Sequence, residues 1–247
     1  MKVQLLSDLH IEFHQDRGVA WIDALDPSDV DVLILAGDIA EVKDGLLSDV
    51  LEVFTDRYPQ VVFVPGNHEY YGSSLGACHE VFESLGQRIA NLHVLRRSSV
   101  EIVGKRFVGA SLWFTQREDE EHSQLENRLN DFHKIAGGFR SWVYDEAQRD
   151  ASYLHQAVQP GDIVVTHHIP SLRGVAPKWK GVVDGFGRFF VHALPETLVR
   201  RARLWCHGHG HDSVRSDFEN HTLVANPFGY LGVEENPDFN PRLTFEI

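Results

Sequence analysis

Residues 32–38 read Val-Leu-Ile-Leu-Ala-Gly-Asp, a continuous apolar run that stops at a glycine and a carboxylate. A run of this length and composition is typical of a strand buried on both faces of a parallel sheet. Such sheets bind ligands beyond the carboxyl ends of their strands, where adjacent loops converge. The stretch therefore predicts an α/β fold, with Asp38 at the edge where a site would form.

The same design recurs on both sides of this stretch, as an apolar run followed at once by a polar cluster. These pairs are 3–6 before Ser7-Asp8-Leu9-His10, 61–64 before Pro65-Gly66-Asn67-His68-Glu69, 163–165 before Thr166-His167-His168, and 203–206 before His207-Gly208-His209-Gly210-His211. Helical spacing of apolar residues over 46–54, 73–89 and 141–158 supplies the intervening helices and predicts parallel crossovers in the first ninety residues. Residues 100–103 and 107–112 flank Gly104-Lys105 and predict a hairpin.

Length, charge and cysteine usage narrow the class of protein. The 247 residues fit one α/β domain over 1–247, in which the polar, helical segment 115–157 either caps the site or forms a peripheral helix pair. A net charge of −13 makes long nucleic acid an unfavourable partner, although a local cationic site could still admit it. Two cysteines, and no apolar run long enough for a signal peptide or a membrane span, predict a cytoplasmic protein without membrane contact.

The five polar clusters offer many metal donors. They are Asp8, His10, Asp38, Asn67, His68, His167, His209 and His211. Imidazole and carboxylate without thiolate suit zinc, manganese or iron. So many donors exceed one tetrahedral centre, and a mononuclear zinc hydrolase would leave half of them unused, whereas two ions about 3.5–4 Å apart with a bridging carboxylate would employ them. Each cluster alone could be an ordinary turn or helix cap, but five of them in succession after strands favour a dinuclear site.

The compound pattern resembles the calcineurin-like metallophosphoesterase superfamily. The matching blocks are Asp8-x-His10, Gly37-Asp38, Gly66-Asn67-His68-Glu69, the strand-end His167, and Gly208-His209-x-His211. Residues 7–13 and 226–230 further resemble bacterial members described as Ser/Thr phosphatase-like. The resemblance implies a four-layer α/β/β/α sandwich, with a dinuclear metal site at the carboxyl ends of the central strands. Gly210 departs from the family, which usually has threonine between the last two histidines.

The resemblance also assigns roles to these residues. It places Asp8, His10 and His211 on a first ion, Asn67, His167 and His209 on a second, and Asp38 between the two. The ions, two divalent or transition metals such as manganese, iron or zinc, would activate a shared water for attack on phosphorus. His68 would protonate the leaving oxygen as general acid. Glu41 stands where family members often carry an acid that orients this histidine, and a solvated carboxylate is the competing interpretation.

The substrate is less defined by the sequence. A phosphorylated small molecule or nucleotide fits the chemistry, and either a phosphomonoester or a diester could be cleaved. Arg173, Lys178, Trp179 and Lys180 could form a cationic, aromatic rim for such a ligand, or merely a solvated loop around a half-buried Trp179. Three alternatives are a nuclease, a cyclic-nucleotide phosphodiesterase, and a non-catalytic scaffold on the same fold. Because every ligand position and His68 are filled, the scaffold is the least favoured.

Overall fold

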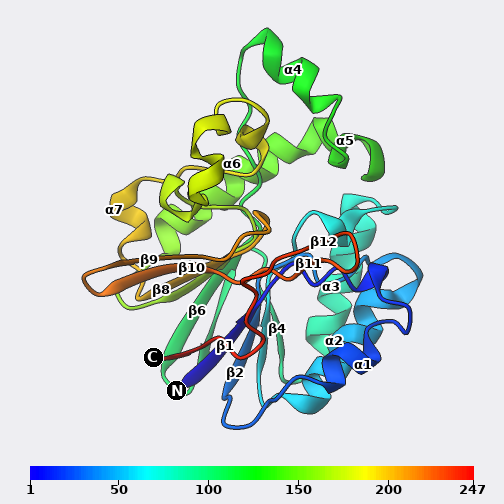
Figure 1. The fold of residues 1–247 in the computed structure, drawn as a ribbon, viewed down its shortest axis with the longest axis vertical. Helices are drawn as coiled ribbons and strands as arrows, with labels where there is room; N and C mark the ends of the chain where they lie inside the picture. The colour runs from blue at the N-terminus through cyan, green and yellow to red at the C-terminus, as the bar shows by residue number, and fades with distance from the viewer.

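Two β-sheets pack face to face, and helices cover the outer side of each (Figure 1). The computed structural model describes residues 1–247, apart from the side chain of residue 120. The first sheet has the order β13–β1–β2–β3–β4, in which β1 to β4 run parallel and β13 pairs antiparallel with β1. Its strands are β1 (Lys2–Leu6), β2 (Val32–Leu35), β3 (Val61–Phe63), β4 (Leu92–Val94) and β13 (Thr244–Glu246).

The second sheet has the order β5–β6–β7–β8–β10–β9. Its inner strands β6, β7, β8 and β10 are parallel, and the edge strands β5 and β9 are antiparallel to their neighbours. The strands are β5 (Ser98–Ile102), β6 (Lys105–Ala110), β7 (Ile163–Thr166), β8 (Leu204–His207), β9 (Val214–Phe218) and β10 (His221–Ala225). A short ribbon of β11 (Gly229–Tyr230) and β12 (Glu234–Glu235) lies beyond the sheets.

Helices α1 (Val19–Asp23), α2 (Leu46–Arg57) and α3 (Leu75–Arg88) cover the first sheet, and α6 (Phe139–Ala157) and α7 (Glu196–Val199) cover the second (Figure 1). The helices α4 (Glu120–Glu126) and α5 (Asp131–Lys134) precede α6. Short 3-10 helices lie between strands and the helices that follow them: η1 (Ile11–Phe13), η2 (Lys43–Gly45), η3 (His68–Tyr70), η4 (Leu172–Gly174), η5 (Pro177–Val182) and η6 (Phe186–Phe189), the last three all between β7 and α7. No described helix combines the length and hydropathy needed to cross a bilayer.

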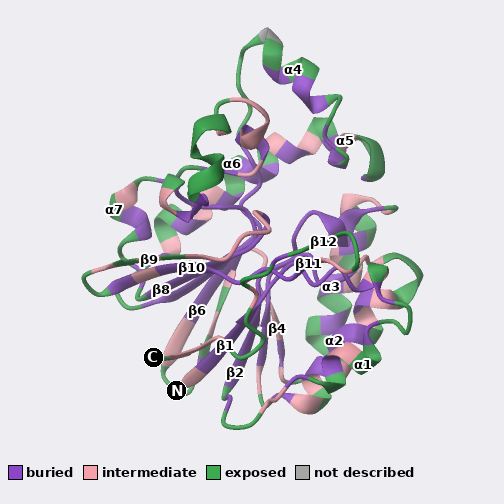
Figure 2. Ribbon diagram, viewed as in Figure 1, coloured by how far each residue is buried: buried purple, intermediate pink, exposed green. Residues whose placement is uncertain are grey.

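Alternation along β2 shows how the layers are built. Leu33 and Leu35 pack towards α2 and α3, in a core that includes Phe54. Val32 and Ile34 face the other way and pack against strands of the second sheet. Both faces of the central strands are therefore buried, whereas the helices expose one side (Figure 2). This arrangement confirms the predicted four-layer α/β/β/α sandwich, and the five predicted strands, three helices and hairpin are all present.

The segment 115–157 has two environments. Leu154 of α6 packs against the second sheet, so this helix belongs to a layer of the sandwich. Arg128 to Asp131, before and at the start of α5, line the main cavity beside the strand ends. The expectation that 115–157 caps the site stays a prediction.

Candidate metal centre

Loops that leave five strands, three in the first sheet and two in the second, bring all the predicted ligands together. Asp8 and His10 follow β1, Asp38 follows β2, Asn67 follows β3, His167 follows β7, and His209 and His211 follow β8. Six of the seven are buried, and only a small part of the His211 side chain is exposed. Residues up to about two hundred positions apart in the chain thus share one polar pocket at the strand ends.

The first group consists of Asp8, His10 and His211. The Nε2 atoms of His10 and His211 are 3.2 Å apart, and His211 Nε2 is 3.6 Å from Asp8 Oδ1. The second group centres on His167, whose Nε2 lies 3.1 Å from His209 Nδ1 and 3.0 Å from Asn67 Oδ1. These are the two sets that the resemblance assigns to separate ions.

Asp38 stands between the groups. Its Oδ2 is 3.4 Å from His167 Nε2 and 3.8 Å from His10 Nε2. Its Oδ1 accepts a hydrogen bond from the backbone N–H of His68 at 2.8 Å, which fixes the carboxylate plane. The position suits a bridging carboxylate.

The donor geometry fits metal ions. Two nitrogens bound to one ion at about 2.1 Å, in tetrahedral or octahedral geometry, lie about 3.0–3.4 Å apart. The close nitrogen pairs in the two groups, at 3.2 Å and 3.1 Å, match that spacing. Burial lowers the pKa values of His10, His209 and His211, which favours the neutral imidazole that binds metals, whereas the Asp38 and Asp8 carboxylates outweigh burial and raise the pKa of His167 to about 10. In addition, Asp8 Oδ2 is buried with no hydrogen-bond partner among the described residues, as expected of a ligand atom.

Most of these ligands also have an uncommon backbone conformation. Asp8, His10, Asp38, His209 and His211 have φ values of 51°, 46°, 54°, 66° and 51°. This left-handed region is sparsely populated by non-glycine residues, although aspartate, asparagine and histidine enter it more readily than others. Conformations of this kind cost about 1–3 kcal/mol each and gather at functional sites. The concentration of this conformation at the predicted ligands agrees with a functional site here.

Glycines make room for the two aspartates. A Cβ on Gly66 would lie 2.2 Å from Asp38 Oδ1, and one on Gly208 would lie 2.4 Å from Asp8 Oδ2. Gly210 is different, since a Cβ there would meet Ile169 Cδ1 at 3.3 Å. This position, where the family usually has threonine, is not sterically restricted in the same way.

His68 lies beside the ligand groups on η3. The Nδ1 atom of His68 is 3.1 Å from Glu12 Oε1, and its Nε2 is 3.2 Å from the Tyr230 hydroxyl. Burial lowers the pKa of His68, but the Asp38 and Glu12 carboxylates outweigh burial and raise the pKa above the ordinary value. The ring lines the cavity and can present a proton there. His10, Asp38 and His68 also offer donor atoms within 4.8 Å of one another, so His68 adjoins the metal groups directly.

The carboxylate at hydrogen-bond distance from His68 is Glu12, and the orienting role expected for Glu41 stays a prediction. Glu12 Oε1 lies 3.2 Å from His10 Nδ1 as well as 3.1 Å from His68 Nδ1. Burial would raise the pKa of Glu12, but the hydrogen bonds to His10 and His68 lower it to about 2. Glu41 is only half-buried, and no hydrogen bond among the described residues joins it to His68. Glu12 sits two residues after His10 on η1, which brings its side chain between the two rings.

Asp131 of α5 is a buried neighbour of the site that sequence reasoning missed. Its Oδ1 accepts hydrogen bonds from Asn67 Nδ2 at 2.9 Å and from the Tyr71 hydroxyl at 2.7 Å. The contact directs the amide nitrogen of Asn67 away from His167 and leaves the amide oxygen facing it. No motif surrounds Asp131, so only the tertiary contact reveals it.

Glu69 has a structural part in the same loops. It is fully buried and accepts backbone hydrogen bonds from Asp38 at 3.0 Å and Ala40 at 3.3 Å, and from Ile39 and Gly66 at 2.6 Å each. These contacts tie the loop after β2 to the loop after β3. His207 is buried as well, with its Nδ1 3.1 Å from the Gly208 carbonyl oxygen, in keeping with the end of a strand.

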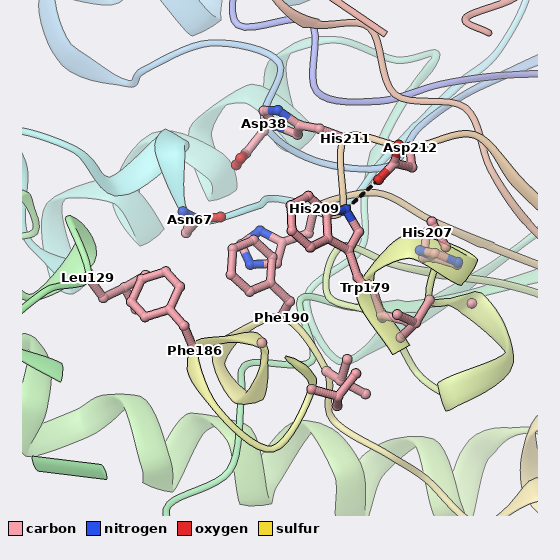
Figure 3. Close-up of a pocket in the computed structure, with 18 of the residues that line it drawn as sticks. Asp38, Asn67, Leu129, Trp179, Phe186, Phe190, His207, His209, His211 and Asp212 are labelled. Atoms are coloured by element: carbon pink, nitrogen blue, oxygen red, sulfur yellow. Dashed lines mark hydrogen bonds between the residues drawn. The ribbon is translucent and has the colours of Figure 1, made fainter. Parts of the chain in front are cut away.

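The cavity that adjoins the ligands measures about 470 Å³, within the range of small-molecule sites. Asp38, Asn67 and His209 line it together with aromatic side chains including Phe186 and Phe190, and Phe190 lies beside His209 (Figure 3). Trp179 of the predicted cationic, aromatic rim lines this cavity, whereas Arg173, Lys178 and Lys180 are not among its described lining residues. Lys178 pairs with Asp212 at 2.7 Å, and the Arg173 guanidinium donates to the Ser216 hydroxyl at 2.9 Å.

The four-layer fold and its histidine–carboxylate groups define a class of metal-dependent phosphoester hydrolases. A model of the calcineurin-like phosphoesterase family matches residues 1–213. The chain belongs to this family and is a metal-dependent phosphoric ester hydrolase.

The chain is similar to several proteins at low sequence identity. Uncharacterized protein L509 of Acanthamoeba polyphaga mimivirus is 22% identical, over 99% of this chain and 96% of that protein. The phosphopantetheinyl hydrolase of Mycobacterium tuberculosis is 18% identical, with a TM-score of 0.72 over 93% of this chain and 89% of that one. A dimetal phosphatase from Danio rerio is 15% identical, with a TM-score of 0.51 over 96% of this chain and 89% of that one. At these identities the solved structures establish the shared fold alone.

Proposed function

We propose that the protein hydrolyses a mono- or diester of phosphoric acid in a small molecule, with a pair of divalent ions held by the seven ligands above. The observation that carries this is the position of Asp38, whose carboxylate lies between two imidazole groups and touches the backbone of His68. Manganese, iron or zinc suits these donors. When bound, such ions supply Lewis-acid activation of water and of the phosphoryl oxygens.

Side chains near the metal groups would provide the proton and the positioning that the reaction requires. His68 would hold the proton that the leaving oxygen receives, with Glu12 keeping its Nδ1 side occupied and its Nε2 side towards the cavity. Asn67, oriented by Asp131, would present its amide oxygen to the second group. Tyr230, 3.2 Å from His68 Nε2, would keep that ring in place before substrate arrives.

Small esters suit the protein better than polynucleotides. The net charge of −13 repels a long polyanion, which disfavours the nuclease alternative. A neighbour in fold is named a phosphopantetheinyl hydrolase, which supports a small organic phosphoester as the kind of substrate. Both cysteines, Cys78 and Cys206, are free and buried, which supports a reducing cytoplasmic location.

The test combines metal analysis with hydrolysis. Purified protein should hold close to two equivalents of transition metal and should cleave p-nitrophenyl phosphate or its bis ester with added manganese. Asp38→Asn should lose metal together with more than about 10³-fold of kcat, since removal of one electrostatic group already costs about 10²–10³. Asp29→Asn is the matched control, because Asp29 is exposed and has a similar left-handed backbone, with φ 61°. Absence of both bound metal and hydrolysis with every divalent ion would support the scaffold instead.

A further inference from the structure

The cavity beside the metal groups is polar at one end and apolar over much of its length. Asn67, His68 and His209 lie at the polar end. The apolar part consists mainly of side chains from residues 169–191, which we call the apolar wall. Its members at the cavity include Ile169, Val175, Trp179, Val182, Phe186 and Phe190.

The apolar wall begins at the metal ligands themselves. The rings of Phe190 and His209 lie with their centroids 4.7 Å apart. Phe186 and Leu129 also line the cavity (Figure 3). The part of a substrate next to a phosphate bound at the metal ligands would therefore contact apolar side chains directly.

The apolar wall is held in place by its own contacts. Ile169 N–H donates to the Phe190 carbonyl oxygen at 3.0 Å, which closes the segment at its base. At the outer end, the Trp179 indole N–H donates to Asp212 Oδ2 and Lys178 Nζ pairs with Asp212 Oδ1, each at 2.7 Å. Both oxygens of Asp212 are thereby engaged, so this carboxylate does not need a polar ligand.

The charges around the cavity disfavour additional phosphates. Among the described lining residues, the carboxylates are Asp38, Asp131, Asp212 and Glu234, and the lysine or arginine is Arg128 alone. The Arg128 guanidinium lies 5.8 Å from the Phe186 ring centre and so covers an apolar surface. A nucleoside polyphosphate would bring further negative charge into mostly acidic surroundings.

From this lining we infer that the substrate is a phosphate ester of an apolar alcohol, whose hydrocarbon part occupies the apolar wall while its phosphate lies at the metal groups. The inference rests on the proposed function for the phosphate end. The hydrocarbon end stands on the cavity alone, because desolvation of apolar surface favours binding wherever the walls are apolar and enclosed.

The test measures binding of n-alkylphosphonates, whose P–C bond is not hydrolysed, to the metal-loaded protein by calorimetry. Affinity should rise with chain length from methyl- to hexylphosphonate, by up to about fourfold per methylene and by at least about tenfold in total. Affinity independent of chain length, or tighter binding of a nucleoside monophosphate than of hexylphosphonate, would overturn the inference.

A substitution at an exposed residue of the apolar wall tests whether the chain-length dependence of phosphonate affinity comes from this wall. Val182 lines the cavity and is 51% exposed, so Val182→Asp should fold normally. This variant should lose most of the chain-length dependence while it keeps affinity for methylphosphonate. Val103→Asp is the control, since Val103 is 88% exposed and lies at the β5–β6 turn, and it should retain the full dependence.

Failure of the two proposals can be told apart. A protein that hydrolyses p-nitrophenyl esters but binds all phosphonates equally retains the proposed function and loses the apolar substrate. A protein that binds hexylphosphonate more tightly than methylphosphonate but cleaves no ester retains the apolar pocket and loses the hydrolase activity.

Discussion

The metal groups and the apolar wall meet in one cavity, yet they are constructed in opposite ways. The ligands come from loops after five different strands, are almost all buried, and are tied by backbone contacts such as those of Glu69. The wall comes from one continuous stretch, residues 169–191, built from short 3-10 turns with Trp179 47% exposed. On the two proposals above, the catalytic groups are held at the ends of the sheet strands, whereas the side chains that would select the substrate lie on one loop, which can vary without disturbing the metal groups.

Of the substitutions that test this contrast between the metal groups and the apolar wall, the largest effect, a loss of kcat, is expected at His68. His68→Ala should keep both metals but lower kcat about 10²–10⁴-fold for alkyl phosphates, which have poor leaving groups. The loss should be much smaller for p-nitrophenyl phosphate, because its leaving group needs little protonation. His155→Ala, at an exposed position of α6, serves as the control. Equal rates of His68→Ala and the parent protein on alkyl phosphates would remove His68 from the mechanism.

An intermediate effect is expected at Asp131, which comes from outside the strand-end loops but contacts a predicted ligand. Asp131→Ala frees the Asn67 amide, so affinity for the second ion should fall about 10–100-fold, as for other residues that orient ligands. Asp131→Asn should restore it, because Oδ1 accepts both hydrogen bonds and Oδ2 has no partner among the described residues. Metal titration by calorimetry, with Tm measured in parallel, checks this. Equal metal affinity in the two variants would show that Asp131 does not position Asn67.

The smallest effect should come from the wall. Trp179→Phe removes the hydrogen bond to Asp212 and should weaken hexylphosphonate binding by about two- to tenfold, the usual range for one such bond. Its metal content and its kcat on p-nitrophenyl phosphate should match those of the parent protein. A loss of metal in this variant would break the contrast, because it would mean that the apolar wall also supports the ligands.

The features that the sequence predicts are those with a local signal. The five predicted strands are short apolar runs, and each ligand follows a strand end within a few residues. Parallel topology brings Asp8 and Asp38 together at one end of the first sheet, and packing of the second sheet against the first adds His167. The motif Gly66-Asn67-His68-Glu69 likewise follows an apolar run directly, so the sequence alone predicts that Asn67 and His68 lie at a strand end.

The contacts that the sequence does not predict depend on tertiary packing. Glu41 lies three residues after Asp38, as the family pattern expects, but the carboxylate at hydrogen-bond distance from His68 is Glu12 on η1, because β1 lies beside β2 in the sheet. Asp131 reaches Asn67 from 64 residues away, through the way α5 sits over the loop after β3. Lys178 lies in a basic stretch, but its ammonium group forms an ion pair with Asp212, which comes from a different loop. A single sequence contains no pattern that fixes these pairings.

The left-handed backbone at five of the ligands has a consequence for how the site can change by mutation. Aspartate, asparagine and histidine tolerate that conformation, and the same three residue types supply oxygen or nitrogen donors. Leucine or valine at Asp8 or His209 would be opposed by the backbone as well as by loss of the donor. The backbone conformation and the need for a metal donor thus independently favour the same three residue types at these positions. We expect neutral drift there to pass through exchanges among Asp, Asn and His, so that descendants which lose the ions would still resemble the metal-binding form.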